Sequence, residues 1–508
     1  MDFAITLDQR SAAPLHKQLY DELRRAILTG RLKPGERVPS TRGLSQSLGV
    51  SRATVTQSYE QLLSEGYLRA ATGSGTFVGC ELPDELLKTK PVEKSRPAAS
   101  LQETGPQEAG RQIELSRYGA SIADSTPFEP PEPEAPINFK MGRPALDEFP
   151  LQQWRRLTLK HYRAKDSSML DVKDCSMLDY AEGSQGYGPL REAIAGYLRH
   201  ARAVKCDPDQ VVIVNGAQQA VDLIAKLLID RGDQVAIENP GYLGARRVFL
   251  AHGAELLPAP VDESGIVVDA LTSKSKGGLK LVYVTPSHQF PTGVTLTLPR
   301  RLDLLCWAEK TGAMIVEDDY DSEFRFGSRP IPSLQGLANG DSVIYVGTFS
   351  KVLFPSLRVG YLIAAPRLAR VFARAKWLAD RQTPAIEQRV LADFINEGHL
   401  ERHLRRMRTI YANRRQTLVH ALETHFGDRV TILGGNAGMH LMVRLRSELD
   451  DDEIERRARA SGVGLVSARL YYLGEECPSN MGAFVFGYAG LSERRIREGA
   501  RRLAKFLK

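Results

Sequence analysis

The chain has 508 residues, of which 42% are hydrophobic and 25% charged, and its formal net charge is +7. This length predicts two or three domains, and the composition is that of a globular protein rather than a disordered or fibrous one. No apolar run is long enough to span a membrane, the N-terminus lacks an apolar leader, and the five cysteines form no CxxC pair. We therefore expect a cytoplasmic protein with no membrane partner, no bound metal and no disulfide framework.

The first segment, residues 11–80, predicts three helices followed by a β-hairpin, a mostly helical domain. Apolar residues recur at helical spacing over 15–30, a shorter helix follows over 41–49, and a third lies over 51–66. The stretch 67–78 then predicts a two-stranded wing with a Gly-Ser-Gly tip. The second and third helices form a helix-turn-helix, in which the start of the later helix contacts base edges of DNA.

Candidate DNA contacts lie at the start of the third helix. Arg52 can bond guanine with two hydrogen bonds, whereas the hydroxyls of Thr54 and Thr56 suit phosphates. The alternative is an ordinary pair of amphipathic helices with solvated arginines.

The motifs PSTR, LGVSRATV, EGY and GTFV resemble the GntR-type winged helix. That resemblance implies dimeric binding to paired half-sites of double-stranded operator DNA. The positions it assigns to DNA contacts are Ser40, Arg42, Ser51, Arg52 and the wing glycine Gly75.

Residues 81–135 are rich in Pro, Glu, Ser and Ala. Such a segment buries too little apolar surface to fold alone, so we expect a linker. Its part at 113–122 is more apolar and is expected to dock on the following domain.

From 136 to 508, apolar strands alternate with amphipathic helices, which predicts a mostly parallel α/β sheet. From about residue 385 the pattern changes to long helices and then strands, which indicates a smaller α+β lobe. The strands are expected at 211–214, 234–237, 280–285, 313–318 and 342–348, and the helices at 217–230 and 300–312.

Three polar residues lie at or just after the ends of apolar strands, where a ligand site can form. Lys351 closes the run SVIYVGTFSK, and Asp318 ends AMIVED, with Tyr320 two residues later on the same side. An amine for a Schiff base, a carboxylate for a pyridine nitrogen and a phenol for the 3′-oxygen are what pyridoxal 5′-phosphate requires. The sequence therefore predicts a site for this cofactor, with Lys351 as the Schiff-base residue.

The same region offers donors for a phosphate group. The backbone amides of Ala217 and Gln218 begin a predicted helix, where anions bind readily. Thr348 and Ser350 supply hydroxyls beside the lysine, and Arg358 supplies a guanidinium further along.

Taken in order, residues 137–508 resemble the fold-type I aminotransferases, and the joint architecture resembles the MocR-type branch of GntR regulators. ENPGY places Tyr242 where the enzymes stack an aromatic ring on the cofactor, and TPSHQFPTG occupies the place of their Asn-Pro-Thr-Gly loop. The resemblance implies a pyridoxal phosphate-dependent regulator that forms a head-to-tail, domain-swapped homodimer. The effector would be a small amine or amino acid, or the cofactor itself.

Two departures favour sensing over turnover. Phe290 stands where the enzymes have Asn, so Tyr320, or a neighbour such as His288, must contact the 3′-oxygen. The last strand carries no arginine before Ser492 for a substrate carboxylate. Arg469 matches an effector-binding arginine of a GABA-responsive relative, and Arg246 is a second candidate.

Two alternatives remain open for the second domain, namely a working aminotransferase with a DNA-binding appendage and a DNA-binding protein whose cofactor is structural. The basic run 401–415 is expected to be a solvated helix face or an additional DNA-contacting patch.

Overall fold

The computed structural model describes residues 13–71, 74–79, 114–123, 135–163, 183–274, 278–326, 331–434, 437–474 and 482–507, together with residues 5, 7, 8 and 11. The chain divides into two compact units, residues 1–112 and 113–508. Most of the expected linker lies outside the described residues. Among the helices described, none has the length and apolar character needed to cross a bilayer.

The first unit is a helix-turn-helix with a β-hairpin, as predicted, although residues 72 and 73 of the wing tip are outside the described part. Leu19, Val55 and Leu62 are fully buried and join the helices in one core. The wing strands pair antiparallel, Leu68 opposite Val78 and Ala71 opposite Gly75. The elements are α1 (Leu15–Leu28), α2 (Thr41–Leu48), α3 (Arg52–Ser64), β1 (Leu68–Ala71) and β2 (Gly75–Val78).

A large mixed sheet organises the second unit, in the order β4-β11-β10-β9-β8-β5-β6-β7. Neighbours from β10 to β6 are parallel, while β11 is antiparallel to both β10 and β4. The five predicted strands are all present. The bounds are β4 (Val211–Val214), β5 (Gln234–Asn239), β6 (Glu255–Asp262), β7 (Gly265–Ile266), β8 (Leu279–Val284), β9 (Met314–Asp319), β10 (Val343–Thr348) and β11 (Gly360–Ile363).

Helices cover both faces of this sheet, because its strands are apolar on both sides. Val212 and Val214 pack with α8, α9 and α13, whereas Val211 and Ile213 face the core that contains α7 and α14. The helices are α6 (Leu151–Arg163), α7 (Gly188–Arg202), α8 (Ala217–Leu228), α9 (Leu243–Ala251), α10 (Val268–Lys274), α11 (Leu298–Thr311), α12 (Leu334–Leu337), α13 (Pro366–Asp380) and α14 (Ala385–Asn396).

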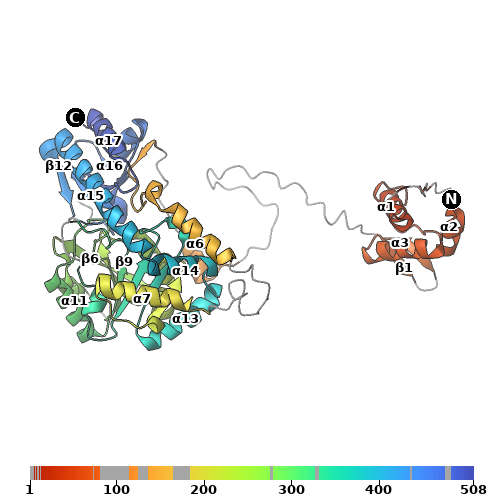
Figure 1. Ribbon diagram of the computed structural model, residues 1–508, viewed down its shortest axis with the longest axis horizontal. Coiled ribbons are helices and arrows are strands. Elements are labelled where there is room, and N and C mark those ends of the chain that lie inside the picture. Colours follow the sequence, from red (N-terminus) through yellow and green to blue (C-terminus); the bar gives the residue numbers. More distant parts are fainter. Residues whose placement is uncertain are drawn as a thin grey trace. The chain divides into compact units, whose positions relative to one another are not determined.

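The C-terminal elements gather in a smaller lobe at one end of the unit (Figure 1). Its antiparallel sheet has the order β12-β13-β16-β15, and a short pair joins β14 to β3 near the start of the unit. The elements are β3 (Ile137–Asn138), α15 (His399–Phe426), β12 (Val430–Leu433), β13 (His440–Leu445), α16 (Asp451–Ala460), β14 (Val463–Gly464), β15 (Val466–Ser467), β16 (Gly482–Gly487) and α17 (Glu493–Phe506).

The apolar segment before this domain docks on it, as predicted. It forms α5 (Arg117–Ala123), which packs on α9. The Tyr118 ring lies 5.0 Å from that of His252, and Ser121 Oγ donates to the carbonyl of Ala251 at 3.3 Å.

Candidate cofactor site and DNA interface

The candidate cofactor residues converge at one edge of the large sheet. Asp318 lies near the end of β9, Thr348 ends β10, and the loop 285–293 follows β8. Because parallel strands end at the same edge, residues far apart in sequence meet there.

Arg358 reaches this edge because β11 runs antiparallel to its neighbours. Gly360, at the start of β11, lies opposite Thr348 on one side and Val214 on the other. Arg358 Nη2 therefore donates to the carbonyl of Asn215 at 2.6 Å. A Cβ on Gly216 would lie 3.1 Å from the same guanidinium, so the cation sits against the start of α8.

Lys351 contacts a residue that the motifs did not indicate. Its Nζ donates to the carbonyl of Gly142 at 3.2 Å. A Cβ at Gly142 would lie 2.6 Å from that nitrogen, and its φ of +67° disfavours any other residue. Gly142 precedes the sheet by many residues, and only the folded chain brings it to the lysine.

Asp318 is buried and retains one unused acceptor. Its Oδ2 accepts from the Tyr283 hydroxyl, while Oδ1 has no hydrogen-bond partner among the described residues. Burial raises the pKa of Asp318 to about 7, against the opposing effects of the Tyr283 hydrogen bond and the Lys351 charge. A protonated ring nitrogen is the kind of donor that such an oxygen accepts.

A set of anion donors lies beside Lys351. Helix α8 begins at Ala217 after Gly216, whose φ is +91°. The first amides of a helix, here those of Ala217 and Gln218, have no partner within it. Ser350 Oγ is buried and has no partner in the described part of the chain, whereas Thr348 Oγ1 accepts from the Ser350 amide at 3.2 Å.

Aromatic rings line the site. Phe290 stands at 5.7 Å from Tyr242, 6.3 Å from Tyr320 and 5.0 Å from Tyr471, in each case edge to face. The Tyr242 hydroxyl also donates to Gln218 Oε1 at 3.4 Å, beside the first turn of α8.

Behind Tyr320 lies a buried polar cluster. The Tyr320 hydroxyl is 2.8 Å from the carbonyl of His288 and 3.0 Å from its Nδ1. The same Nδ1 is 3.0 Å from Asp321 Oδ2. Within the described residues, ligating atoms of His288, Asp321 and His440 lie within 4.8 Å of one another.

Taken together, the donor set fits pyridoxal phosphate. It provides an amine at Lys351, an open carboxylate oxygen at Asp318, and an anion cradle at α8, Ser350 and Arg358.

The two arginines expected to bind an effector carboxylate are engaged elsewhere. Arg469 Nη2 donates to both carboxylate oxygens of Asp452 on α16, at 2.9 and 3.2 Å. Arg246 Nη1 donates to the carbonyl of Tyr472 at 3.1 Å. Burial lowers the pKa of Arg246, and the Arg247 charge adds to that effect.

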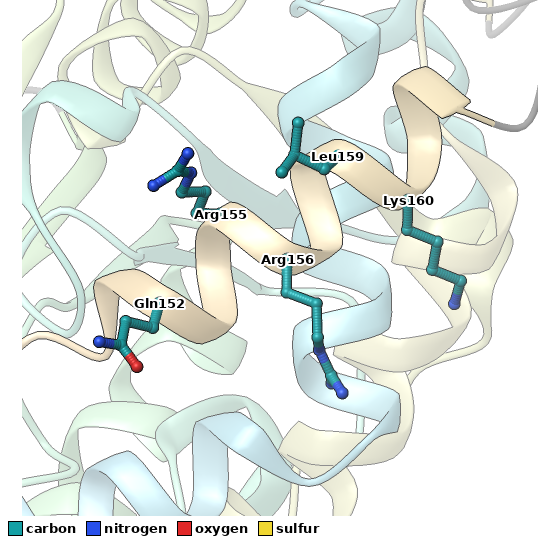
Figure 2. Close-up of a pocket in the computed structure, with 5 residues that line it drawn as sticks. All are labelled: Gln152, Arg155, Arg156, Leu159 and Lys160. Atoms are coloured by element: carbon teal, nitrogen blue, oxygen red, sulfur yellow. The ribbon is translucent and has the colours of Figure 1, made fainter.

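A separate hollow lies on α6, lined by Gln152, Arg155, Arg156, Leu159 and Lys160 (Figure 2). Arg156 pairs with Glu397 at 3.0 Å and Lys160 with Asp393 at 2.9 Å, so two of its cations are already paired.

The basic run lies within α15. There Arg408 donates to the carbonyl of Glu323 at 2.7 Å, Arg414 donates to the carbonyl of Ala489, and Arg406 pairs with Glu148. Arg414 is buried, whereas Arg402, Arg405, Arg406 and Arg408 are exposed, as expected of a solvated helix face.

In the first unit, two serines cap the helices of the helix-turn-helix. Ser40 Oγ accepts from the Gly43 amide and Ser51 Oγ from the Thr54 amide, both at 3.1 Å. The Thr54 hydroxyl also lies 2.9 Å from Ser51 Oγ. These contacts fix the starts of α2 and α3.

The cations at these helix starts, Arg42 and Arg52, are exposed, and Thr56 is half-buried on α3. In the wing, a Cβ on Gly75 would lie 2.8 Å from Arg37 Nε. Arg37, which the motifs did not indicate, thus lies against the wing.

Comparison with known proteins covers nearly the whole chain. Residues 15–78 match the family model for bacterial regulatory proteins of the gntR family, and residues 136–503 match that for aminotransferase class I and II. The probable rhizopine catabolism regulatory protein MocR of Rhizobium meliloti is 39% identical over 497 residues, 97% of this chain and 94% of that protein. The pyridoxine biosynthesis transcriptional regulator PdxR of Corynebacterium glutamicum is 31% identical, with 98% and 96% covered.

Among solved structures, the α-aminoadipate aminotransferase LysN of Thermus thermophilus, complexed with N-(5′-phosphopyridoxyl)-L-leucine, is 32% identical with a TM-score of 0.66. The match covers 73% of this chain and 92% of LysN. A winged helix and an aminotransferase fold in one chain, shared along their length with regulators, establish the family. The chain belongs to the MocR-type branch of the GntR-family transcriptional regulators.

Proposed function

We propose that this regulator binds pyridoxal 5′-phosphate at the edge of its large sheet and responds there to a small amine or amino acid. The observation that carries the proposal is the unused Asp318 Oδ1, buried at the same edge as Lys351. A buried acceptor without a donor is unfavourable unless a ligand supplies one.

Each residue then has a defined task. Lys351 holds the cofactor through its amine, Asp318 accepts from the ring nitrogen, and Tyr242 stacks on the ring. Ala217, Gln218, Thr348, Ser350 and Arg358 hold the phosphate. Pyridoxal phosphate supplies an aldehyde, a group that condenses with primary amines.

The effector is proposed as an amine because of that chemistry, with Arg469 and Arg246 as candidates for its carboxylate once released from their present partners. One relative is a probable regulator of rhizopine catabolism and another a regulator of pyridoxine biosynthesis, and the cofactor itself is therefore kept as an alternative effector of this chain. DNA binding is assigned to Ser40, Arg42, Ser51, Arg52, Thr54, Thr56 and Gly75 in a cytoplasmic, head-to-tail homodimer.

Chemical trapping tests the cofactor assignment. The purified chain is mixed with pyridoxal phosphate, reduced with borohydride and digested. We expect a pyridoxyl group on the peptide that contains Lys351, and we expect a Lys351→Ala variant to lack the absorbance band of the Lys351 Schiff base. A label on other lysines only would refute the proposal.

An active aminotransferase is the second candidate, favoured by the 32% identity to LysN across the second unit. Steady turnover of an amino donor with a keto acid, at rates approaching the enzyme median of about 10 per second, would support it. Turnover that is slower by orders of magnitude would favour the regulator over the aminotransferase.

A further inference from the structure

Phe290 leaves the cofactor site with an apolar ring where an amide donor is expected. Its ring stands edge to face against Tyr320, at 6.3 Å, and against His440, at 5.6 Å. The Tyr320 hydroxyl is then the donor assigned to the cofactor's 3′-oxygen, and its orientation depends on what lies behind it.

His288 is buried and lies directly behind that hydroxyl. Its Nδ1 is 3.0 Å from both the Tyr320 hydroxyl and Asp321 Oδ2. Because a carboxylate only accepts, we assign the proton to Nδ1, which then donates to Asp321 Oδ2 and shares that hydrogen bond with the Tyr320 oxygen. A Cβ on Gly438 would lie 2.0 Å from Cε1 and 2.2 Å from Nδ1 of His288, so the imidazole occupies space that only a glycine at 438 leaves open.

The Tyr320 hydroxyl keeps its proton in this environment. Burial raises its pKa well above the usual range, and the nearby carboxylates Asp321, Asp318 and Glu238 act in the same direction. The single proton of this hydroxyl is donated to the His288 carbonyl at 2.8 Å. Donation to a 3′-oxygen therefore requires this proton to turn away from the carbonyl, while the phenol oxygen keeps its contact with His288 Nδ1 at 3.0 Å.

We propose that His288 and Asp321 form a positioning pair that holds the Tyr320 hydroxyl for the 3′-oxygen of pyridoxal phosphate, in place of the amide that Phe290 lacks. The inference rests on the proposed function. His288 and Asp321 act through Tyr320 and are positioning residues.

A divalent cation held by His288, Asp321 and His440 is the competing explanation of the cluster. The contacts present argue against it. His288 Nδ1 and Asp321 Oδ2 already share a hydrogen bond, and His440 Nε2 is 3.2 Å from the carbonyl of Pro291. These three atoms have partners without an ion, whereas Asp321 Oδ1 has none among the described residues.

The test uses the full-length protein loaded with pyridoxal phosphate, and the readout is the pH midpoint of its visible absorbance band. His288→Ala should shift the midpoint in the same direction as Tyr320→Phe, by about one pH unit, which is a tenfold change in the ratio of the two forms. In a Tyr320→Phe background, His288→Ala should add nothing, because both act through one hydroxyl. His288→Gln keeps an amide near Tyr320, and its midpoint should lie between those of the wild type and of His288→Ala.

His440→Gln is the matched control, since its ring packs 4.7 Å from that of His288 but bonds Pro291 rather than Tyr320. It should leave the midpoint unchanged. Asp321→Asn preserves the side-chain shape and should shift the midpoint as His288→Ala does, even if the alanine variant fails to fold.

If the wild-type protein shows the absorbance band but the midpoint shifts of His288→Ala and Tyr320→Phe add, the positioning pair is wrong and the proposed function stands. The positioning pair is also wrong if the purified protein contains one equivalent of a divalent metal and the His288→Ala variant contains none. A wild-type chain that takes up no cofactor would overturn both this inference and the proposed function.

Discussion

A single carboxylate oxygen sets what the cofactor site can bind. Asp318 uses Oδ2 for Tyr283 and leaves Oδ1 without a partner in the described structure. The Tyr283 hydroxyl fixes the orientation of the carboxylate, and so the open oxygen points in a defined direction.

Asp318→Asn should weaken binding of pyridoxal phosphate by about 10- to 100-fold, the value of a hydrogen bond to a charged group. Tyr283→Phe, which leaves the carboxylate in place, should cost much less. Absorbance titration of the two variants measures this. Equal losses would show that the open oxygen does not contact the ligand.

Gly142→Ala should abolish or strongly weaken cofactor binding, because the added Cβ would lie 2.6 Å from Lys351 Nζ. Gly196→Ala is the control, since no atom lies within 4 Å of its added Cβ and helix α7 gains propensity there. Equilibrium dialysis of both variants provides the comparison. If Gly142→Ala binds pyridoxal phosphate as the wild type does, residue 142 and Lys351 Nζ are not in close contact in solution.

Residue types and spacing could predict Lys351, Asp318 and Tyr320, because each follows an apolar strand in a recognisable motif. They could not predict Gly142, which contacts the lysine from more than two hundred positions earlier in the chain. Nor could they show that Arg469 pairs with Asp452, because the partner comes from another helix.

At the scale of elements, buried Glu238 at the end of β5 holds the loop after β8. Its Oε2 accepts from the Thr285 amide at 3.0 Å and hydroxyl at 2.6 Å, and from Gln289 Nε2 at 3.3 Å. Burial raises the pKa of Glu238 from 4.5 to about 7. The loop that carries His288 and Phe290 thus depends on a group that titrates near neutrality.

The folded protein keeps a proton on Glu238 between pH 4.5 and 7, where the unfolded chain loses it. The free energy of unfolding contributed by this group therefore falls as pH rises through that window. Glu238→Gln removes this loss. The free energy of unfolding of the variant minus that of the wild type should therefore increase between pH 5 and pH 8, by up to about 3 kcal/mol. Urea denaturation at both pH values measures it, with exposed Glu309→Gln as control. Parallel pH profiles would contradict the expectation.

The long strands and helices of the sheet could be predicted because their apolar periodicity is strong. The antiparallel placement of β11 could not, since a short apolar run has no direction in its pattern. That placement decides where Arg358 lies. The β3–β14 pair likewise joins two dipeptides that carry no strand signal of their own.

At the scale of the molecule, the two compact units have separate cores. We expect two heat-unfolding transitions in calorimetry. Pyridoxal phosphate at about 100 times its Kd should stabilise one of them by about 2.7 kcal/mol and leave the other unchanged. A single transition that moves as a whole would show that the units unfold together.

The strand β3 and the helix α5 tie neighbouring stretches of chain to different bodies. Ile137 pairs with Val463 in the small lobe, while α5 packs on α9 beside the large sheet. The small lobe thus binds β3, and the large-sheet region binds α5, which precedes β3 in the chain. Any rotation of the small lobe against the large sheet therefore moves β3 relative to α5, or separates α5 from α9.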